Sequence, residues 1–501
     1  MAKSYRSKLI YPLAAALLAT FGCNKEEDLA PAATLSQSTA SALQDGSVNP
    51  SVRFRANNYI IISASNALPA DLESQVAALK GNVTGNLKEV GIAMATSSDA
   101  NFAAKAAKIS GVQSVIRDVN IQWFDPQNTK TVSADAIIGS PASTGDDDPY
   151  ALFQWGLTAI HAPEAWNAGA RGKGVRVAVL DTGFDLKHPD LAANIDQNAA
   201  RSFVPGESVQ FNPAIGDFSH GTHTAGTIAA VDNNIGVIGV APDAQLVLVK
   251  VLSDKGSGNF SWMIQGILYA VQQGADVINM SLGAGLPRNG KFLDDNGTPD
   301  DPSDDFVVSD TKATQELINA ISKVTTYATQ HGTTVIASAG NDANNGNKDG
   351  SLMYIPAGAP NVISISATAP EAWVYNPLTT DLDGVASYTN YGTSDVTFAA
   401  PGGDFRYPGN EASKYGIPVW ALDMVISTVP GGYSWSAGTS MAAPHAAGIA
   451  ALIIGQHGGQ MNPAQVEAAM RASADDLGKP GRDPYYGFGR LNAFKAVTAV
   501  Q

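Results

Sequence analysis

Hydrophobic positions between residues 58 and 124 follow two alternating periods. Short apolar runs with the composition of strands alternate there with segments whose apolar positions repeat at helical spacing. The strand-like and helical segments are residues 59–62, 71–79, 88–95, 102–109 and 112–123. Their order predicts a small β-α-β-β-α-β unit.

A different pattern begins near residue 150 and continues to the C-terminus. Short, almost wholly apolar runs rich in β-branched residues alternate with helical segments, as is typical of strands buried on both faces. These runs lie at residues 175–180, 246–251, 277–280, 334–338 and 362–367. The pattern predicts a large α/β domain over residues 148–501, with a mostly parallel sheet and helices on both faces.

The first residues have the organisation of a secretory signal. In residues 1–22, basic positions precede an apolar run that is too short to span a membrane comfortably. Cys23 follows at once and is the only cysteine of the chain, so no internal disulfide explains it. It is either incidental, within a signal that is cut elsewhere, or the lipidated first residue of a lipoprotein. Gly22-Cys23 resembles the end of a lipobox, and Lys25-Glu26-Glu27 resembles a surface-export tag. The sequence thus predicts a lipid anchor to a membrane at Cys23.

Two polar segments separate these parts. Residues 23–57 are rich in Ala, Ser and Pro and predict a tether, and residues 125–147 predict a linker that contains a cleavage site.

Hydrophobic residues make up 44% of the 501 residues and charged residues 15%, which excludes a globally disordered chain. The net charge of −15 argues against nucleic acid as a partner, because phosphate binding needs clustered Lys and Arg.

Four polar residues stand at the ends of predicted elements in the large domain. Asp181 and Asn341 each follow an apolar strand, and His220 and Ser440 each precede a helix. Singly, each has an ordinary explanation as a turn residue, a helix cap or a core histidine. Capping alone does not require all four at successive element ends of one sheet, which is where sites of open α/β sheets lie.

Together these residue types supply the chemistry of acyl transfer. A serine hydroxyl is a weak nucleophile, and His220 can take the proton of Ser440 and later hand it to a leaving amine. Asp181 can hold the imidazole tautomer and stabilise the imidazolium. The side-chain amide of Asn341 and the backbone N–H of Ser440 can bind the tetrahedral oxyanion.

The order Asp, His, Ser and the residues around each of them resemble those of the subtilisin-like serine proteases. Within that family, the chain resembles the thermitase-like branch. The matching motifs are Asp181-Thr182-Gly183, His220-Gly221-Thr222-His223 and Gly438-Thr439-Ser440-Met441-Ala442-Ala443-Pro444-His445. The resemblance covers about residues 148–500. It implies a monomeric endopeptidase that cleaves proteins or peptides through an acyl-enzyme. His223 and His445 match structural members of the motifs.

Residues 58–124 resemble the ferredoxin-like inhibitor propeptide of the same family. This resemblance implies a zymogen whose own propeptide is an intramolecular inhibitor. The implied product is exported, either as an outer-membrane or cell-surface lipoprotein or as a protein secreted after propeptide removal.

The resemblance also implies how substrate binds. Family members take an extended peptide as an added strand between two enzyme edges, and Gly256-Ser257-Gly258 and Ser281-Leu282-Gly283 resemble those edges. The first segment is either such an edge or a plain turn. Asp342 resembles a residue at the mouth of the primary pocket, and Tyr354 one at its base.

A structural Ca²⁺ site is implied as well. Calcium takes six to eight oxygen ligands, which mix carboxylates with carbonyls. Asp190 and Asn233 would give side chains, Val231, Ile235 and Val237 would give carbonyls, and Asp148 would complete the site. The alternative is an ordinary polar surface loop.

An acidic insertion at residues 294–305 interrupts the family pattern. It is either a solvated surface loop or an additional calcium loop without the spacing of an EF-hand.

Two other functions compete with the endopeptidase: a non-catalytic binding protein on a protease scaffold, and an esterase of the α/β-hydrolase type. The esterase would need the order Ser, Asp, His and a Gly-x-Ser-x-Gly elbow, and the residues around Ser440 form neither.

Overall fold

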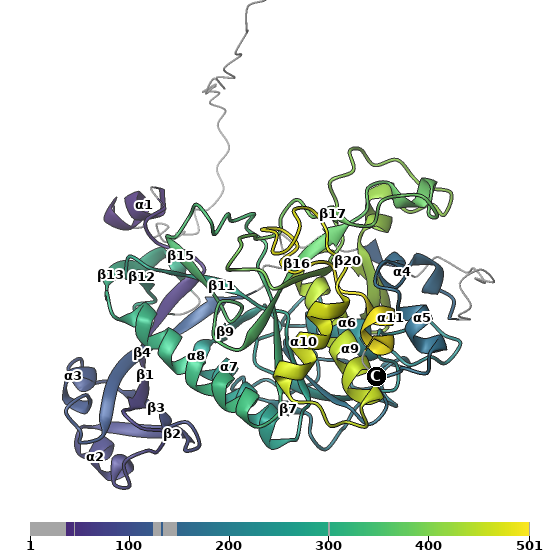
Figure 1. The fold of residues 1–501 in the computed structure, drawn as a ribbon. Helices are drawn as coiled ribbons and strands as arrows, with labels where there is room; N and C mark the ends of the chain where they lie inside the picture. The colour runs from purple at the N-terminus through teal and green to yellow at the C-terminus, as the bar shows by residue number, and fades with distance from the viewer. Residues whose placement is uncertain (1–36, 45, 124–131, 134–147, 299–300, 500–501) are drawn as a thin grey trace, which may run out of the picture.

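The computed structural model describes residues 37–44, 46–123, 132–133, 148–298 and 301–499 (Figure 1). The predicted signal, the lipidation site at Cys23 and nearly all of the predicted linker lie outside these residues. Within the described part of the chain, no helix is both long and apolar enough to cross a membrane.

Residues 52–123 form the N-terminal unit, which has the predicted β-α-β-β-α-β order. Its sheet has the strand order β2-β3-β1-β4, with every pairing antiparallel, as in a ferredoxin-like fold. The elements are β1 (Val52–Ser63), α2 (Leu72–Ala78), β2 (Gly81–Leu87), β3 (Ile92–Ser97), α3 (Phe102–Ala106) and β4 (Val112–Gln122).

Two parts of this unit depart from the sequence-based expectation. The pattern did not mark β2, whose residues Gly-Asn-Val-Thr-Gly-Asn-Leu have low strand propensity and gain their order by pairing with β3. The first half of β1 and helix α1 (Gln37–Gln44) lie in the segment expected to be a tether. Their partners come from residues about 240 positions further along the chain, which local pattern does not reveal.

Residues 148–499 form the C-terminal domain, which is built on the predicted parallel sheet. Its strand order is β17-β16-β14-β10-β6-β8-β7, and β18 also pairs with β16. All of these pairings are parallel except the one with β17. The strands are β6 (Arg176–Asp181), β7 (Arg201–Ser202), β8 (Gln245–Lys250), β10 (Val277–Met280), β14 (Thr334–Ser338), β16 (Val362–Ala369), β17 (Gly384–Val385) and β18 (Phe398–Pro401).

Helices cover both faces of this sheet, as predicted (Figure 1). Alternate residues of one strand enter different cores: Val177 and Val179 pack with one group of helices, and Ala178 and Leu180 with the other. The first group is α5 (Ala162–Asn167), α6 (His220–Ala229), α9 (Thr439–Gln456), α10 (Pro463–Ser473) and α11 (Ala493–Thr498). The second group is α7 (Phe260–Gln272) and α8 (Ala313–Gln330).

Shorter elements surround the main sheet. One small sheet contains β11 (Ala284–Pro287) and β15 (Leu352–Ile355), and another contains β19 (Val425–Val429), β20 (Gly432–Ser436) and β5 (Val132–Ser133). The remaining helices are η1 (Ala151–Phe153), α4 (Trp155–Ala159), η2 (Pro302–Asp304), η3 (Trp373–Tyr375) and η4 (Val419–Asp423).

The sheet of the N-terminal unit continues into the C-terminal domain. Strand β4 pairs antiparallel with β9 (Ser257–Asn259), and β1 pairs in parallel with β12 (Lys291–Asp294), which in turn pairs with β13 (Phe306–Ser309). Helices α7 and α8 pack against β4 from the C-terminal domain. The two parts of the chain therefore share one sheet and one hydrophobic core.

Candidate active site

Three neighbouring strands of the main sheet bring the predicted site residues to one edge. The register pairs Val179 of β6 with Asn279 of β10, and Met280 of β10 with Ala337 of β14. Because these strands are parallel, their carboxyl ends lie together, with Asp181 at the end of β6, Ser281 just after β10 and Asn341 just after β14.

Asp181 and His220 form a buried pair. The Nδ1 atom of His220 lies 2.7 Å from Oδ1 of Asp181, and the side chains are 1% and 0% exposed. The Thr224 hydroxyl donates to the other carboxylate oxygen at 3.1 Å, and the Thr182 N–H donates to Oδ1 at 2.7 Å. His220 opens α6, whose N-cap Ser219 accepts a hydrogen bond from the Thr222 N–H. These contacts fix the imidazole ring and direct its Nδ1–H toward the carboxylate.

Ser440 lies in the first turn of α9 and is held beside the end of β10. Its hydroxyl donates to the backbone carbonyl of Ser281 at 3.1 Å, and the Ser281 hydroxyl donates to the carbonyl of Ser440 at 2.8 Å. The side-chain amide of Asn279 in turn donates to the Ser281 hydroxyl at 3.0 Å. The predicted nucleophile is thus attached to the strand next to the one that carries Asp181.

Asn341 is oriented by the residue that precedes Ser440. Its Oδ1 accepts from the backbone N–H of Thr439 at 2.9 Å and from the Thr439 hydroxyl at 2.7 Å. Its Nδ2 lies 3.5 Å from the position that a Cβ atom would take on Gly438. The first N–H groups of a helix have no partner within the helix, so the amide group of Asn341 and the start of α9 present donors to one region.

The two other motif histidines are buried and contact backbone carbonyls. Burial lowers the pKa of His223 to about 3 and that of His445 to about 4, so both rings are neutral at pH 7. His223 Nε2 contacts the carbonyls of Val425 and Ser434, and His445 Nδ1 contacts the carbonyl of Met441.

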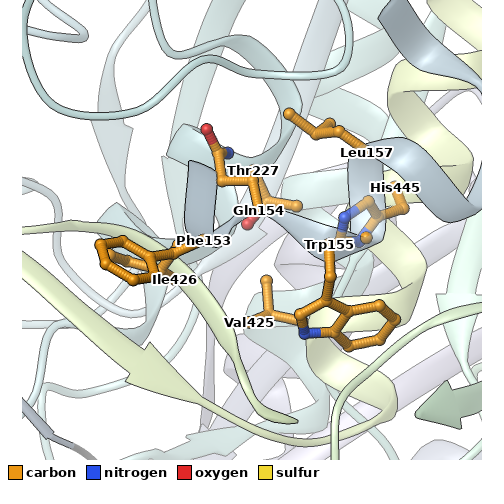
Figure 2. A pocket seen from close by; sticks show the side chains of 9 residues that line it. Phe153, Gln154, Trp155, Leu157, Thr227, Val425, Ile426 and His445 are labelled. Carbon is orange, nitrogen blue, oxygen red and sulfur yellow. The ribbon is translucent and has the colours of Figure 1, made fainter. Parts of the chain in front are cut away.

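A small cavity of about 10 Å³ lies beside His445 and has room for about one water molecule. Figure 2 shows its lining, in which Trp155 and His445 stand at one end and Phe153 and Ile426 at the other. The cavity is too small for a peptide.

The predicted substrate edge at Gly256-Ser257-Gly258 is occupied by the N-terminal unit. Asn120, Ile121 and Gln122 of β4 pair with β9 in antiparallel register. The Trp123 N–H donates to the carbonyl of Gly256, and its indole N–H donates to that of Gly258. Gly258 is required here because a Cβ would lie 2.6 Å from the carbonyl oxygen of Val251. The second predicted edge, Ser281-Leu282-Gly283, directly follows β10. Its role in substrate binding stays a prediction.

Three polar contributions were not foreseen from the sequence. Thr224 stands four residues after His220 on α6, which is the spacing that places two side chains on one helix face. The Ser281 hydroxyl holds the carbonyl of Ser440. Asp118 of β4 accepts hydrogen bonds from the backbone N–H and the hydroxyl of Ser261, at the start of α7, at 3.2 and 2.6 Å. No local signal identifies Asp118, because its partner is far away in the sequence.

The predicted calcium ligands gather in one region. The Val231 N–H donates to the carbonyl of Asp190 at 2.8 Å, the Val237 N–H donates to Oδ2 of Asp190 at 3.1 Å, and the Asn233 carboxamide accepts from the Ile235 N–H. Asp148 and Asp190 are each 0% exposed. The loop also meets the segment after Asp148, because the Tyr150 N–H donates to the carbonyl of Gly236.

The chemistry of this region fits a hard cation. Oδ1 of Asp190 is buried and accepts no hydrogen bond from a described residue. Burial raises the pKa of Asp190 to about 6, although hydrogen bonds from Val237, Tyr433 and Asn233 lower it. Among the described residues no three His, Cys, Asp or Glu side chains cluster as metal ligands, so backbone carbonyls would complete the coordination.

Asp342 and Tyr354 lie together near Asn341. Burial raises the pKa of Tyr354, and the nearby Asp342 carboxylate, to which the phenol hydrogen-bonds, raises it further. The phenol therefore remains protonated, and the contact ties Tyr354 of β15 to the loop that carries Asn341 and Asp342.

Comparisons with known proteins agree with this geometry. The model of the subtilase family (peptidase S8) matches residues 172–489, which is more than half of the chain. Subtilisin NAT from Bacillus subtilis subsp. natto is 37% identical over 344 residues, covering 68% of this chain and 71% of that protein. Thermitase from Thermoactinomyces vulgaris is 34% identical over 354 residues, covering 70% and 98%.

The fold similarity extends beyond the family model. The crystal structure of the epidermin leader peptide processing serine protease from Staphylococcus aureus superimposes with a TM-score of 0.67, covering 89% of this chain and 99% of that one, at 22% identity. That likeness shows the α/β fold and includes residues before 172. The chain belongs to the subtilase family and is a serine endopeptidase.

Proposed function

We propose that the chain is an exported endopeptidase that is made as a zymogen and that acts through Asp181, His220 and Ser440. The observation that carries the catalytic assignment is the chain of contacts from Thr224 through Asp181 to His220, with Ser440 held at the end of the adjacent strand. The family model matches residues 172–489, which include Asp181, His220 and Ser440, and this supports the same roles.

In this mechanism Ser440 Oγ attacks the carbonyl carbon of the scissile peptide bond while His220 takes its proton. Asp181 accepts the Nδ1–H hydrogen bond and stabilises the imidazolium. The oxyanion binds to the Asn341 amide and the Ser440 N–H. The C–N bond then breaks as His220 protonates the leaving amine, and water hydrolyses the acyl-enzyme by the reverse proton transfers.

The test of the catalytic role is Ser440→Ala, with the exposed Ser394→Ala as a matched control. We expect hydrolysis of a protein substrate to be abolished by the first substitution and unchanged by the second. Wild-type activity in Ser440→Ala would refute the mechanism and would favour a different nucleophile. A properly folded wild-type C-terminal domain that stays inactive after the linker is cut and the N-terminal unit is removed would favour the binding-protein alternative.

The N-terminal unit is, in this proposal, an inhibitor propeptide. The support is that β4 runs along the Gly256–Gly258 edge, where a substrate strand would add, and that Asp118 binds the start of α7. Maturation then requires a cut between residues 124 and 147. N-terminal sequencing of the purified enzyme should place its start in that range, whereas Ser440→Ala should keep the N-terminal unit covalently attached.

A structural calcium ion between Asp190 and the loop at residues 231–237 is a further part of the proposal. It would neutralise the buried carboxylates and would contribute to stability rather than to chemistry. EDTA should lower the thermal midpoint of the wild type, and Asp190→Asn should lower it without EDTA and remove most of the chelator's effect. A midpoint unaffected by EDTA would count against the site.

Export through a lipoprotein signal with Cys23 as the anchor rests on sequence alone. Cys23→Ser should move the protein from the membrane fraction to the soluble fraction. Protein substrates are the expected class, and the protein is expected to act as a monomer.

A further inference from the structure

The acidic insertion folds into a strand pair that contacts the N-terminal unit. Strands β12 and β13, with the described residues between them, are called here the acidic hairpin, which comprises residues 291–298 and 301–309. Its Asp294, Asp295 and Asp305 are 6%, 2% and 3% exposed, so these carboxylates do not belong to a solvated loop. Figure 1 shows the hairpin next to α1 and the N-terminal part of β1.

Backbone pairing joins the hairpin to β1. Arg53 and Phe54 pair in parallel register with Leu293 and Asp294. The Asp295 N–H donates to the carbonyl of Phe54 at 3.1 Å, and the carboxylate of Asp295 accepts from the Ala56 N–H at 3.0 Å. The rings of Phe54 and Phe292 pack with centroids 4.5 Å apart. These contacts give the β1 segment a fixed register on the hairpin.

Charge complementarity accompanies this pairing. Arg53 forms an ion pair with Asp305 at 2.8 Å, Arg55 one with Asp295 at 3.5 Å, and Arg117 of β4 one with Asp294. Arg117 also stacks over the ring of Phe54. Every arginine is on the N-terminal unit and every carboxylate is on the hairpin. The interface is therefore electrostatic as well as apolar.

This contact is separate from the one at the substrate edge. The start of β1 and the end of β4 form a two-stranded ribbon, in which Val52 pairs with Ile121 and Phe54 with Val119. The ribbon lies between two strands of the C-terminal domain, with β9 on the side of β4 and β12 on the side of β1. A cut after residue 123 leaves the β1–β12 contact intact.

We propose that the acidic hairpin is a second binding surface for the N-terminal unit, one that retains the cleaved unit through Arg53, Arg55 and Arg117 and makes its release sensitive to salt. The inference rests on the proposed zymogen function. The two contacts of the N-terminal unit reinforce each other, because while one contact is formed the surfaces of the other stay at a high effective concentration. The Debye length falls from roughly 14 Å at 50 mM salt to roughly 4 Å at 500 mM salt, so added salt weakens the charged contact.

The test uses the full chain, which is allowed to process itself. Cutting of the linker is read as two bands on a denaturing gel, which tests the proposed function independently of whether the pieces separate. Retention is read as the fraction of the N-terminal unit that coelutes with the C-terminal domain on size-exclusion chromatography at 50 and 500 mM NaCl. Release is also read as the appearance of activity toward a short peptide substrate.

The principal variant is Asp294→Asn with Asp295→Asn and Asp305→Asn. Its matched control removes three exposed aspartates whose partners lie in the C-terminal domain: Asp243→Asn, Asp381→Asn and Asp476→Asn. We expect the principal variant to hold the cleaved unit about tenfold more weakly at 50 mM salt and to lose most of its salt dependence, since each partly buried pair contributes a factor of about two. The control should match the wild type.

A charge exchange separates attraction from structural damage. Arg53→Asp and Asp305→Arg should each weaken retention, and the double variant should restore it. If the hairpin variants fail to fold, Arg53→Gln with Arg55→Gln removes two pairs without altering the C-terminal domain and should still weaken retention. Linker cutting with equal, salt-independent retention in the wild type and in these variants would overturn the inference and leave the proposed zymogen intact.

Discussion

Asp118 allows a quantitative prediction of how pH affects the free energy of unfolding of the chain. Its carboxylate is 3% exposed, and burial raises its pKa to about 6 from an ordinary value of 3.8, despite hydrogen bonds from Ser261 and Val119. A tenfold difference in acidity corresponds to about 1.4 kcal/mol. Ionised Asp118 therefore reduces the folded state's stability by about 3 kcal/mol relative to its protonated form.

The sign follows from the direction of the shift. Because the pKa is higher in the folded chain, the favourable contribution of Asp118 is fully present below about pH 4 and is lost as the pH rises through 6. In Asp118→Asn the amide oxygen still accepts from Ser261 but carries no charge. This variant should be about 3 kcal/mol more stable than its parent at pH 8 and equal to it at pH 4.

Equilibrium urea unfolding at pH 4, 6 and 8 measures this difference, in a Ser440→Ala background that prevents self-digestion. Asp118→Ala is the companion variant: it leaves the Ser261 donors without an acceptor and should be about 1–3 kcal/mol less stable than Asp118→Asn at every pH. If Asp118→Asn destabilised the chain at pH 8, the start of α7 would be stabilising the carboxylate, and the reasoning from burial would be refuted.

Three more substitutions test the site and its surroundings. Asn341→Ala should lower kcat by roughly 10²–10³ with little change in KM, measured with a peptide amide, because it removes a donor to the oxyanion. Thr224→Val removes the hydroxyl that binds Asp181 and should lower kcat about tenfold or more, without changing the thermal midpoint by more than a few degrees. Gly236→Ala should destabilise the fold strongly in thermal unfolding, because φ is 62° and the new Cβ would lie 1.9 Å from the Tyr433 hydroxyl oxygen. Gly274→Ala, at a φ of 70° with open space around it, is the control and should cost about 1 kcal/mol.

The main sheet and the position of the site were readable from the sequence because their signals are local. The strands at residues 277–280 and 334–338 have the bounds that their apolar runs predicted, since a strand buried on both faces is apolar along most of its length. Asp181 and Asn341 stand just beyond such runs, and parallel pairing brings them to one edge.

The elements that the sequence did not predict depend on pairing partners far away along the chain. Strand β2 has weak propensity and is ordered by β3, and the start of β1 is ordered by β12. The insertion at residues 294–305 reads as a loop or a metal site because its composition shows many carboxylates and not the arginines that face them. Composition identifies a charged segment, but only the fold identifies its counter-charges.

The acidic hairpin has a second consequence once the N-terminal unit has left. Departure of the β1–β4 ribbon exposes the edges of β9 and β12, and an open strand edge can pair with a second molecule and lead to aggregation. In the proposed function, strand β9 must remain accessible, because a substrate strand would pair there. Strand β12 has no such task, and the carboxylates of Asp294 and Asp295 then stand uncompensated along its edge, where like charge repels the same edge of another copy. If the N-terminal unit is removed as proposed, the aspartates that bind its arginines would thus also keep the remaining enzyme monodisperse.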